Sequence, residues 1–284
     1  MGSEGIRFTK MHGLGNDYLY IDARELPDQN WPELARAMSD RHFGVGADGI
    51  ILIVRSNRAP VGMRIFNLDG SESEMCGNGL RAMAKWLFDR GQLGRLQDIE
   101  TGAGVLHPEI VDVENGKAVR IRVDMGAARW TRADLGIVVG APNDTFQNQP
   151  VVVGDITVVG TGVSMGNPHF IVFGPLWDDR QLYQMGPSLE THPLFSRRIN
   201  VHCVEVNAPD RIRMRHWERG SGPTLACGTG VAAAVSAAAA SGLTESRVQV
   251  TVPGGSLTAE IADDGRVFLE GPAVEVFEGV YRPT

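Results

Sequence analysis

Lysine is scarce in this chain of 284 residues, which contains only Lys10, Lys85 and Lys117. Pyridoxal-phosphate enzymes hold their cofactor through a Schiff-base lysine, and none of these three lysines sits beside a convincing phosphate loop. The chain also lacks a Walker loop, a dinucleotide fingerprint and the C-x-x-C and H-E-x-x-H spacings of metal sites. We therefore expect a protein that uses neither an organic cofactor nor a metal ion.

Cysteine is scarce as well, and the three cysteines Cys76, Cys203 and Cys227 cannot all pair with one another. Their odd number, behind a start without the charged-then-apolar pattern of an export signal, indicates free thiols in a reducing cytoplasm. No apolar run reaches the length of a membrane span. The net charge of −7 and the pI near 5.5 disfavour nucleic acid and anionic membranes as partners. We expect a small molecule as the partner instead.

Two of the three cysteines lie in a motif that occurs twice. Cys76-Gly77-Asn78-Gly79 and Cys227-Gly228-Thr229-Gly230 are 151 residues apart (227 − 76), and each precedes a run of helix-forming residues. The same offset pairs Gly15-Asn16 with Gly166-Asn167. Several matches at one fixed offset indicate two related halves, each with one cysteine in the same local setting.

The repeated motif predicts that each cysteine stands at the N-terminus of a helix. Glycine on both sides of Asn78 or Thr229 permits a tight turn and leaves backbone N–H groups uncovered. Such N–H groups and the helix dipole stabilise an anion, so they favour thiolate over thiol and can hold a substrate carboxylate. The alternative is that Cys76 and Cys227 are small buried residues beside glycine turns.

The remaining pattern predicts an α+β fold of two pseudo-symmetric domains, each a strand-rich, barrel-like sheet around one central helix. The central helices are expected from Cys76 to about residue 90 and from Cys227 to about residue 241, with further helices at 31–39 and within 176–189. The expected domains are residues 1–127 with 273–284, and residues 128–272. Strands are expected at 6–11, 18–22, 50–54, 62–66, 98–101, 104–113, 118–123, 150–159, 162–165, 170–173, 199–206, 211–217, 248–252, 255–261, 266–270 and 273–281.

Two thiols in related halves can act as acid and base on opposite faces of one carbon, or as a redox pair. The other polar residues favour the first chemistry. Arg219 suits a carboxylate, while asparagines and Glu218 in loops and at strand ends suit an ammonium group. One thiolate would then take an α-proton while the opposite thiol delivers a proton, which inverts an amino acid without a cofactor.

Several motifs along the chain carry a resemblance to a known family. They are His12-Gly13-Leu14-Gly15-Asn16-Asp17, Asn67 with Asp69-Gly70-Ser71, Met75-Cys76-Gly77-Asn78-Gly79, Gly166-Asn167-Pro168-His169, and Glu218-Arg219-Gly220 with Ala226-Cys227-Gly228-Thr229-Gly230. Together they resemble the diaminopimelate epimerase family over essentially the whole chain. The proline racemase group has histidine in place of Asn78, and PhzF-like isomerases lack the cysteine pair.

The resemblance implies conversion of LL- to meso-diaminopimelate, a step toward lysine and peptidoglycan, with Cys76 and Cys227 as the two bases. It implies that His169 and Glu218 assist the thiols. One departure is Gly49, which stands where some family members have a glutamine contact to the distal end of the substrate. The implied substrate contacts are Asn16, Asn67, Gly77, Asn78, Asn167, Asn200, Glu218, Arg219, Gly228 and Thr229.

We expect a cytoplasmic homodimer in which Cys203 belongs to a hydrophobic core. We expect structural roles for the histidines that show no ligand spacing, which are His42, His107, His192, His202 and His216. Three alternatives remain open from the sequence. They are a racemase of the same fold acting on another amino acid, a catalytically silent binding protein, and a thiol redox protein.

Overall fold

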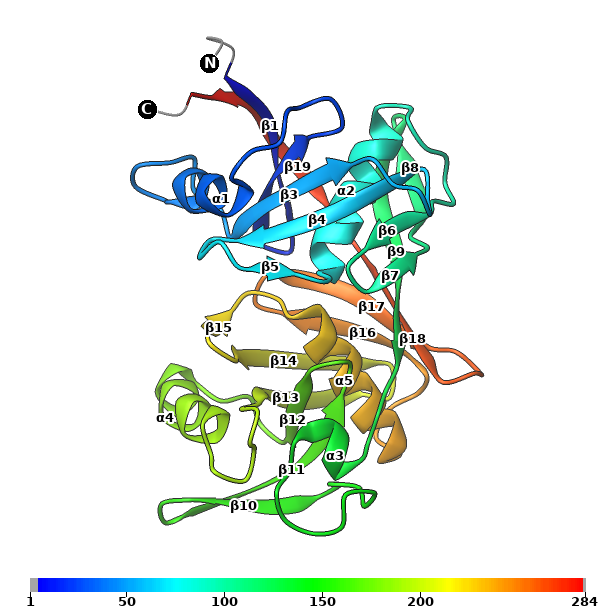
Figure 1. Cartoon of the computed structure of the whole chain (residues 1–284). Coiled ribbons are helices and arrows are strands. Elements are labelled where there is room, and N and C mark those ends of the chain that lie inside the picture. The colour runs from blue at the N-terminus through cyan, green and yellow to red at the C-terminus, as the bar shows by residue number, and fades with distance from the viewer. Residues whose placement is uncertain (1–4, 283–284) are drawn as a thin grey trace. The chain divides into compact units, whose positions relative to one another are not determined.

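The computed structural model describes residues 5–282, which form two compact units (Figure 1). Of the described residues, the first unit comprises 5–123 and 270–282, and the second comprises Asp124–Leu269. The domain boundaries expected from the sequence lie between residues 127 and 128 and between residues 272 and 273. Residues 1–4 and 283–284 of the expected first domain lie outside the described residues. In the part of the chain described, no helix is both long and apolar enough to cross a membrane.

The first unit is built on an eight-stranded sheet with the order β19-β1-β2-β3-β4-β6-β7, in which β5 pairs with β4. The pairs β2/β3 and β4/β6 are parallel and the other pairs are antiparallel. The strands are β1 (Ile6–Gly13), β2 (Asn16–Asp22), β3 (Gly49–Val54), β4 (Val61–Asn67), β5 (Glu72–Ser73), β6 (Ile99–Thr101), β7 (Gly104–Leu106) and β19 (Val274–Tyr281).

The strands β8 (Glu109–Glu114) and β9 (Lys117–Ala127) form an antiparallel hairpin. Asn115 and Gly116 connect them with φ angles of 49° and 75°. Two positive φ angles are what a type I′ turn requires, so the hairpin that Asn-Gly predicted is confirmed.

Two helices pack on this first unit. Helix α1 (Trp31–Ser39) begins at Asn30, whose side chain accepts a hydrogen bond from the Glu33 amide. Its buried face joins strands β1 to β4 in a hydrophobic core. Helix α2 (Gly77–Asp89) begins immediately after Cys76 and contacts β1, β2, β8 and β19. It is therefore the central helix that the sequence predicted for this half.

The strands of the second unit follow one another in the order β10-β11-β12-β13-β14-β16-β17-β18, and β15 pairs with β14. The pairs β12/β13 and β14/β16 are parallel. The strands are β10 (Gln149–Val153), β11 (Ile156–Ser164), β12 (Pro168–Phe173), β13 (Asn200–Ala208), β14 (Arg211–Glu218), β15 (Gly222–Thr224), β16 (Arg247–Val252), β17 (Gly255–Ile261) and β18 (Arg266–Gly271).

The helices of this unit are α3 (Arg132–Leu135), α4 (Asp179–Glu190) and α5 (Gly228–Ala240). Helix α5 contacts β11, β12, β13 and β17, and its residues 230–238 are all buried. Nine of its 13 residues are alanine or glycine, which lets strands approach it closely. The expected α+β arrangement of strands around a central helix is thus confirmed in each unit.

Two expected strands are wrong in detail. The run 150–159 is not one strand, because the chain reverses at Gly154 (φ 58°) and Asp155 to make the antiparallel pair β10/β11. A left-handed φ of this kind suits glycine. The run 104–113 is divided into β7 and β8 around His107 and Pro108, because proline has no N–H to donate to a sheet.

Candidate active site

Each unit places one cysteine immediately before its central helix. Cys76 is the N-cap of α2, with φ −141° and ψ 114°, and Cys227 is the N-cap of α5, with φ −127° and ψ 103°. Both backbones are extended at the cysteine and turn helical at the glycine that follows. The prediction that both thiols stand at helix N-termini is confirmed.

The Cys76 sulfur lies among hydrogen-bonding groups of the first unit. It accepts a hydrogen bond from the Gly79 amide at 3.4 Å and lies 3.5 Å from Oδ1 of Asn16. The Tyr18 hydroxyl also interacts with this sulfur. Burial raises the pKa of Tyr18 well above its ordinary value, so the hydroxyl keeps its proton and can donate it to the sulfur.

Asn16 and Asn78 are held together beside Cys76. The Asn78 amide donates to Oδ1 of Asn16 at 3.3 Å, and the Asn16 amide donates to Asp48 at 2.7 Å. Arg81, from the second turn of α2, donates to Oδ1 of Asn78 at 2.7 Å. The two asparagines implied as substrate contacts therefore have fixed amide orientations.

Arg81 is fully buried, which the sequence did not indicate. Its Nε and Nη1 atoms have no hydrogen-bond partner, and no carboxylate pairs with it, within residues 5–282. Burial lowers the pKa of Arg81 from 12.5 to about 10, against the opposing effects of Cys76 and Tyr20. A buried, incompletely satisfied cation thus stands on the helix that begins at Cys76.

The other implied contacts of this unit are less closely associated with the sulfur. The Asn67 side chain donates to the Ser71 hydroxyl at 3.0 Å at the end of β4. Gly77 is the first, buried residue of α2. Gly49 begins β3, and a Cβ atom there would come within 2.3 Å of the Phe66 carbonyl oxygen. A side chain such as glutamine therefore has no room at residue 49 unless the neighbouring strand shifts.

The second unit surrounds Cys227 with different groups. Cys227 is 4% exposed, and its sulfur lies 3.7 Å from the Thr229 hydroxyl. The Glu218 carboxylate, at the end of β14, interacts with the thiol through charge and a hydrogen bond. Asn167 donates to the Thr229 hydroxyl at 3.3 Å, so four of the implied residues meet at the start of α5.

The expectation that the helix N-termini favour thiolate is corrected by the electrostatics of both sites. Burial raises the pKa of Cys76, although the Gly79 amide and Arg81 act in the opposite direction. Burial and Glu218 together raise the pKa of Cys227 well above its ordinary value. Desolvation outweighs the helix N-terminus because a buried anion loses its hydration. Cys76, with more groups that favour the anion, is the more readily ionised thiol of the two.

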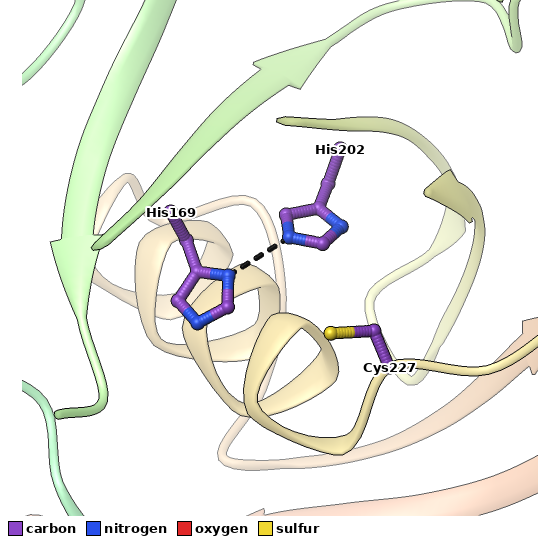
Figure 2. A group of neighbouring side chains, drawn as sticks. All are labelled: His169, His202 and Cys227. Carbon is purple, nitrogen blue, oxygen red and sulfur yellow. Dashed lines mark hydrogen bonds between the residues drawn. The ribbon is translucent and has the colours of Figure 1, made fainter. Parts of the chain in front are cut away.

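A row of three buried histidines lies behind Cys227. Nδ1 of His169, in β12, is 2.9 Å from Nε2 of His202 in β13, and Nδ1 of His202 is 3.1 Å from Nδ1 of His216 in β14. Figure 2 shows the His169 and His202 rings with the Cys227 sulfur turned toward them. Burial lowers the pKa of His169 and of His216 to about 3, and that of His202 well below its ordinary value.

The sequence assigned His202 and His216 only structural roles, and it missed their place beside His169.

The side chains of Asn200 and Arg219, both implied substrate contacts, already make hydrogen bonds within the second unit. Both ends of the buried Asn200 amide bond to backbone, at the Pro168 carbonyl (2.9 Å) and the Arg219 amide (2.9 Å). The Arg219 guanidinium donates to the Arg197 carbonyl at 2.8 Å. Cys203 is buried in β13, as expected.

The fold is shared with several solved structures. A PhzF-family phenazine biosynthesis protein from Bacillus anthracis aligns with a TM-score of 0.70 at 20% identity, covering 99% of this chain and 100% of the other. A hydroxyproline epimerase from Agrobacterium vitis aligns with a TM-score of 0.65 at 12% identity, covering 98% and 91%. At these identities the likeness establishes the shared fold alone.

Sequence comparison defines the family. The sequence model of diaminopimelate epimerase matches residues 8–131 and 161–276. The diaminopimelate epimerase of Heliobacterium modesticaldum is 44% identical over 279 residues, covering 96% of this chain and 99% of the relative. That of Bacillus subtilis is 45% identical over 282 residues, covering 97% and 98%. The chain belongs to the diaminopimelate epimerase family and is an isomerase, and the resemblance seen in its motifs is confirmed.

Proposed function

We propose that this protein converts LL-diaminopimelate to meso-diaminopimelate by proton transfer between two thiols, without a cofactor. The observation that carries the proposal is the duplicated setting of Cys76 and Cys227, each the N-cap of a central helix. Membership of the family supports the substrate. The reaction would supply a precursor of lysine and peptidoglycan.

The surroundings of the two thiols favour different resting roles. Cys76 donates to Oδ1 of Asn16 and accepts from the Gly79 amide, and more groups favour its anion than favour that of Cys227, so it is the thiol that more readily supplies a thiolate. Cys227 donates its proton toward Glu218, so its sulfur holds a proton ready for delivery. In one direction the Cys76 thiolate takes the α-proton and leaves the electron pair on carbon. The Cys227 S–H bond then breaks as a new C–H bond forms on the opposite face, and the reverse reaction exchanges the roles.

The charge that develops next to the substrate carboxylate needs stabilisation. The uncovered amides at the starts of α2 and α5 supply hydrogen-bond donors and the positive ends of two helix dipoles. We propose the main chains of Gly77, Asn78, Gly228 and Thr229 for this role. Asn16, Asn67, Asn167, Glu218 and Arg219 are proposed as the groups that hold the amino-acid head and the distal end. Asn200 would act through the Arg219 loop that it holds, and His169 would act by orienting Asn167.

We further propose that the protein works in the cytoplasm as a homodimer. Three cysteines without a disulfide among the described residues support a reducing compartment. Light scattering of the reduced protein measures its oligomeric state, and a monomer that retained full turnover would contradict a required dimer.

The direct test is incubation of the purified, reduced protein with LL-diaminopimelate, followed by chiral chromatography of the products. Formation of the meso isomer is expected, with proline, glutamate and histidine left unchanged. Inversion of one of these three amino acids but not of diaminopimelate would favour a racemase of another substrate. Retained activity after dialysis against a chelator is expected, and a requirement for added pyridoxal phosphate or metal would contradict the mechanism.

Single substitutions test the two-thiol mechanism. Cys76→Ala and Cys227→Ala are each expected to abolish net epimerisation, by a factor of about 10³ or more, because each face needs its own proton carrier. Cys203→Ala is the matched control, since this thiol is buried in β13 and belongs to neither repeated motif, and the variant is expected to retain most activity. Near-normal turnover by either active-site variant would show that one thiol suffices.

A further inference from the structure

His169, His202 and Cys227 come from three elements and converge on one point. Each offers one ligand atom, and the three ligand atoms all lie within 4.8 Å of one another in fully buried surroundings. Figure 2 shows both imidazoles and the sulfur directed into the same space at the first turn of α5. Imidazole nitrogen and thiolate sulfur together are the ligands that Zn²⁺ prefers in proteins.

The hydrogen bonds around the histidines fix which nitrogen atoms carry protons. Asn167 donates its Nδ2 to Thr229, so its carbonyl oxygen faces His169 Nε2 at 2.9 Å. A carbonyl oxygen only accepts, so His169 carries its proton on Nε2 and has a lone pair on Nδ1. His202 then donates its Nε2 proton to His169, and His216 donates its Nδ1 proton to His202.

The hydrogen bonds between the three histidines could in principle run the other way, from His169 to His202 to His216, but the environment of His216 disfavours this. Nε2 of His216 has no hydrogen-bond partner within residues 5–282. When His216 donates to His202, this Nε2 atom is an unsatisfied acceptor. When the hydrogen bonds run the other way, it is a buried, unsatisfied N–H donor. Buried orphan donors are the rarer and costlier of the two in proteins.

The distances suit a tetrahedral metal after small movements. Zn–N bonds of about 2.0 Å and Zn–S bonds of about 2.3 Å place tetrahedral ligand atoms about 3.3 to 3.6 Å apart. The facing nitrogens of His169 and His202 are 2.9 Å apart now and need to separate by less than about 1 Å. Their outer nitrogens are already held, by Asn167 and by His216. Such support of the outer ring nitrogen is the usual second layer of a histidine metal site.

We propose that His169, His202 and Cys227 form a binding site for a thiophilic divalent cation such as Zn²⁺. Three protein ligands leave a fourth position open for water. Coordination replaces the S–H bond of Cys227 with a sulfur–metal bond and releases one proton, for which Glu218 is the neighbouring acceptor. To bind the metal through Nε2, His202 must move its ring proton to Nδ1. His216 must then move its own proton from Nδ1 to Nε2, which has no hydrogen-bond partner within residues 5–282. This cost makes the site one for reversible binding and not a permanent structural centre.

The other thiol provides an internal contrast. Cys76 is surrounded by amide, backbone and hydroxyl groups. Among the described residues, the cluster of candidate metal ligands contains Cys227 and does not contain Cys76. The metal is therefore expected to select Cys227 over Cys76. If the proposed two-thiol function holds, metal binding removes one of its two proton carriers and inhibits the enzyme.

Cobalt titration tests the site without relying on activity. Co²⁺ added to the reduced protein in a buffer free of thiols is expected to produce a thiolate-to-cobalt charge-transfer band that saturates at one metal per chain. The band should disappear in Cys227→Ala and weaken at least tenfold in affinity in His202→Gln. It should persist in Cys76→Ala and in His107→Gln, a control at an exposed histidine. Circular dichroism checks that His202→Gln is folded, and if it is not, the two cysteine variants decide the question.

Persistence of the band in Cys227→Ala, its loss in Cys76→Ala, or its absence from the unmodified protein would overturn the proposal. A second measurement follows turnover of LL-diaminopimelate with increasing Zn²⁺, each variant being compared with its own metal-free rate. The concentration for half inhibition should rise at least tenfold in His202→Gln. A protein that binds cobalt as described but does not epimerise diaminopimelate would contradict the proposed function while leaving the metal site intact.

Discussion

Replacing Arg81 by methionine is expected to separate stability from activity in the first unit. The guanidinium is fully buried, and its pKa falls from 12.5 to about 10 because of that burial. At 1.36 kcal/mol per unit, this shift corresponds to about 3 kcal/mol of unfavourable free energy in the folded state. Methionine fills a similar volume without a charge. Losing the hydrogen bond to Asn78 destabilises the variant by about 1.5 to 3 kcal/mol, which offsets most of this gain. A net stabilisation between zero and about 2 kcal/mol is therefore expected.

Activity should change in the opposite direction. Arg81 helps to lower the pKa of Cys76 and holds the amide of Asn78 next to Asn16. A rise of one unit in the pKa of Cys76 reduces the thiolate fraction about tenfold, so turnover is expected to fall by about tenfold or more. Arg81→Gln, which keeps a donor but removes the charge, should lose less activity than Arg81→Met if the hydrogen bond is the larger contribution.

Urea denaturation and turnover of each variant measure the two effects. Arg55→Met is the control, because the Arg55 side chain is 72% exposed and its removal should change neither quantity appreciably. The reasoning is refuted if Arg81→Met destabilises the protein by more than about 3 kcal/mol, since the buried cation would then be net stabilising. A stable variant with unchanged turnover would refute the functional part.

Two further predictions concern the first unit. In a Cys203→Ala, Cys227→Ala background, alkylation of Cys76 by iodoacetamide should accelerate as pH rises, because only the thiolate reacts. Burial raises the pKa of this thiol, so the midpoint should lie above the value of about 8.5 typical of free cysteine, and a midpoint below neutral pH would contradict it. Gly49→Ala should destabilise the protein by about 1 to 3 kcal/mol, because the new Cβ would meet the Phe66 carbonyl oxygen at 2.3 Å. Thermal melting against Gly94→Ala, where no atom lies within 4 Å, makes the comparison, and equal melting of the two variants would show that β3 yields freely.

Local sequence signals predicted the features that depend on local chemistry. The C-G-x-G motifs located the starts of α2 and α5, since glycine and the following helix formers act within one turn. Asn115-Gly116 located a hairpin for the same reason. The reversal at Gly154-Asp155 was missed because the mostly apolar segments 151–153 and 156–159 were joined into one run, although Gly-Asp between two such segments is itself a hairpin signal. Periodicity alone does not divide such a run into two strands.

The electrostatics of the site and the row of histidines depend on contacts between distant segments. His202 and His216 are direct partners in the β13/β14 register, and His169 is brought beside them by the parallel β12/β13 pair. Neither register is visible from the spacing of histidines along the chain. The direction of the thiol pKa shifts was likewise set by burial, which depends on everything that packs around the helix starts.

The pairing of β1 with β19 has a consequence for how the protein is made. The ribosome releases β1 well before its partner Val274–Tyr281, which follows only after the whole second unit. The second unit is continuous in sequence and can fold as soon as it emerges. Meanwhile one edge of β1 keeps its backbone groups unpaired, and such an edge invites association with other chains. Nascent chains of this protein therefore pass through a stage in which β1 has emerged but lacks its partner β19, and this is the stage at which a chaperone would be of most use.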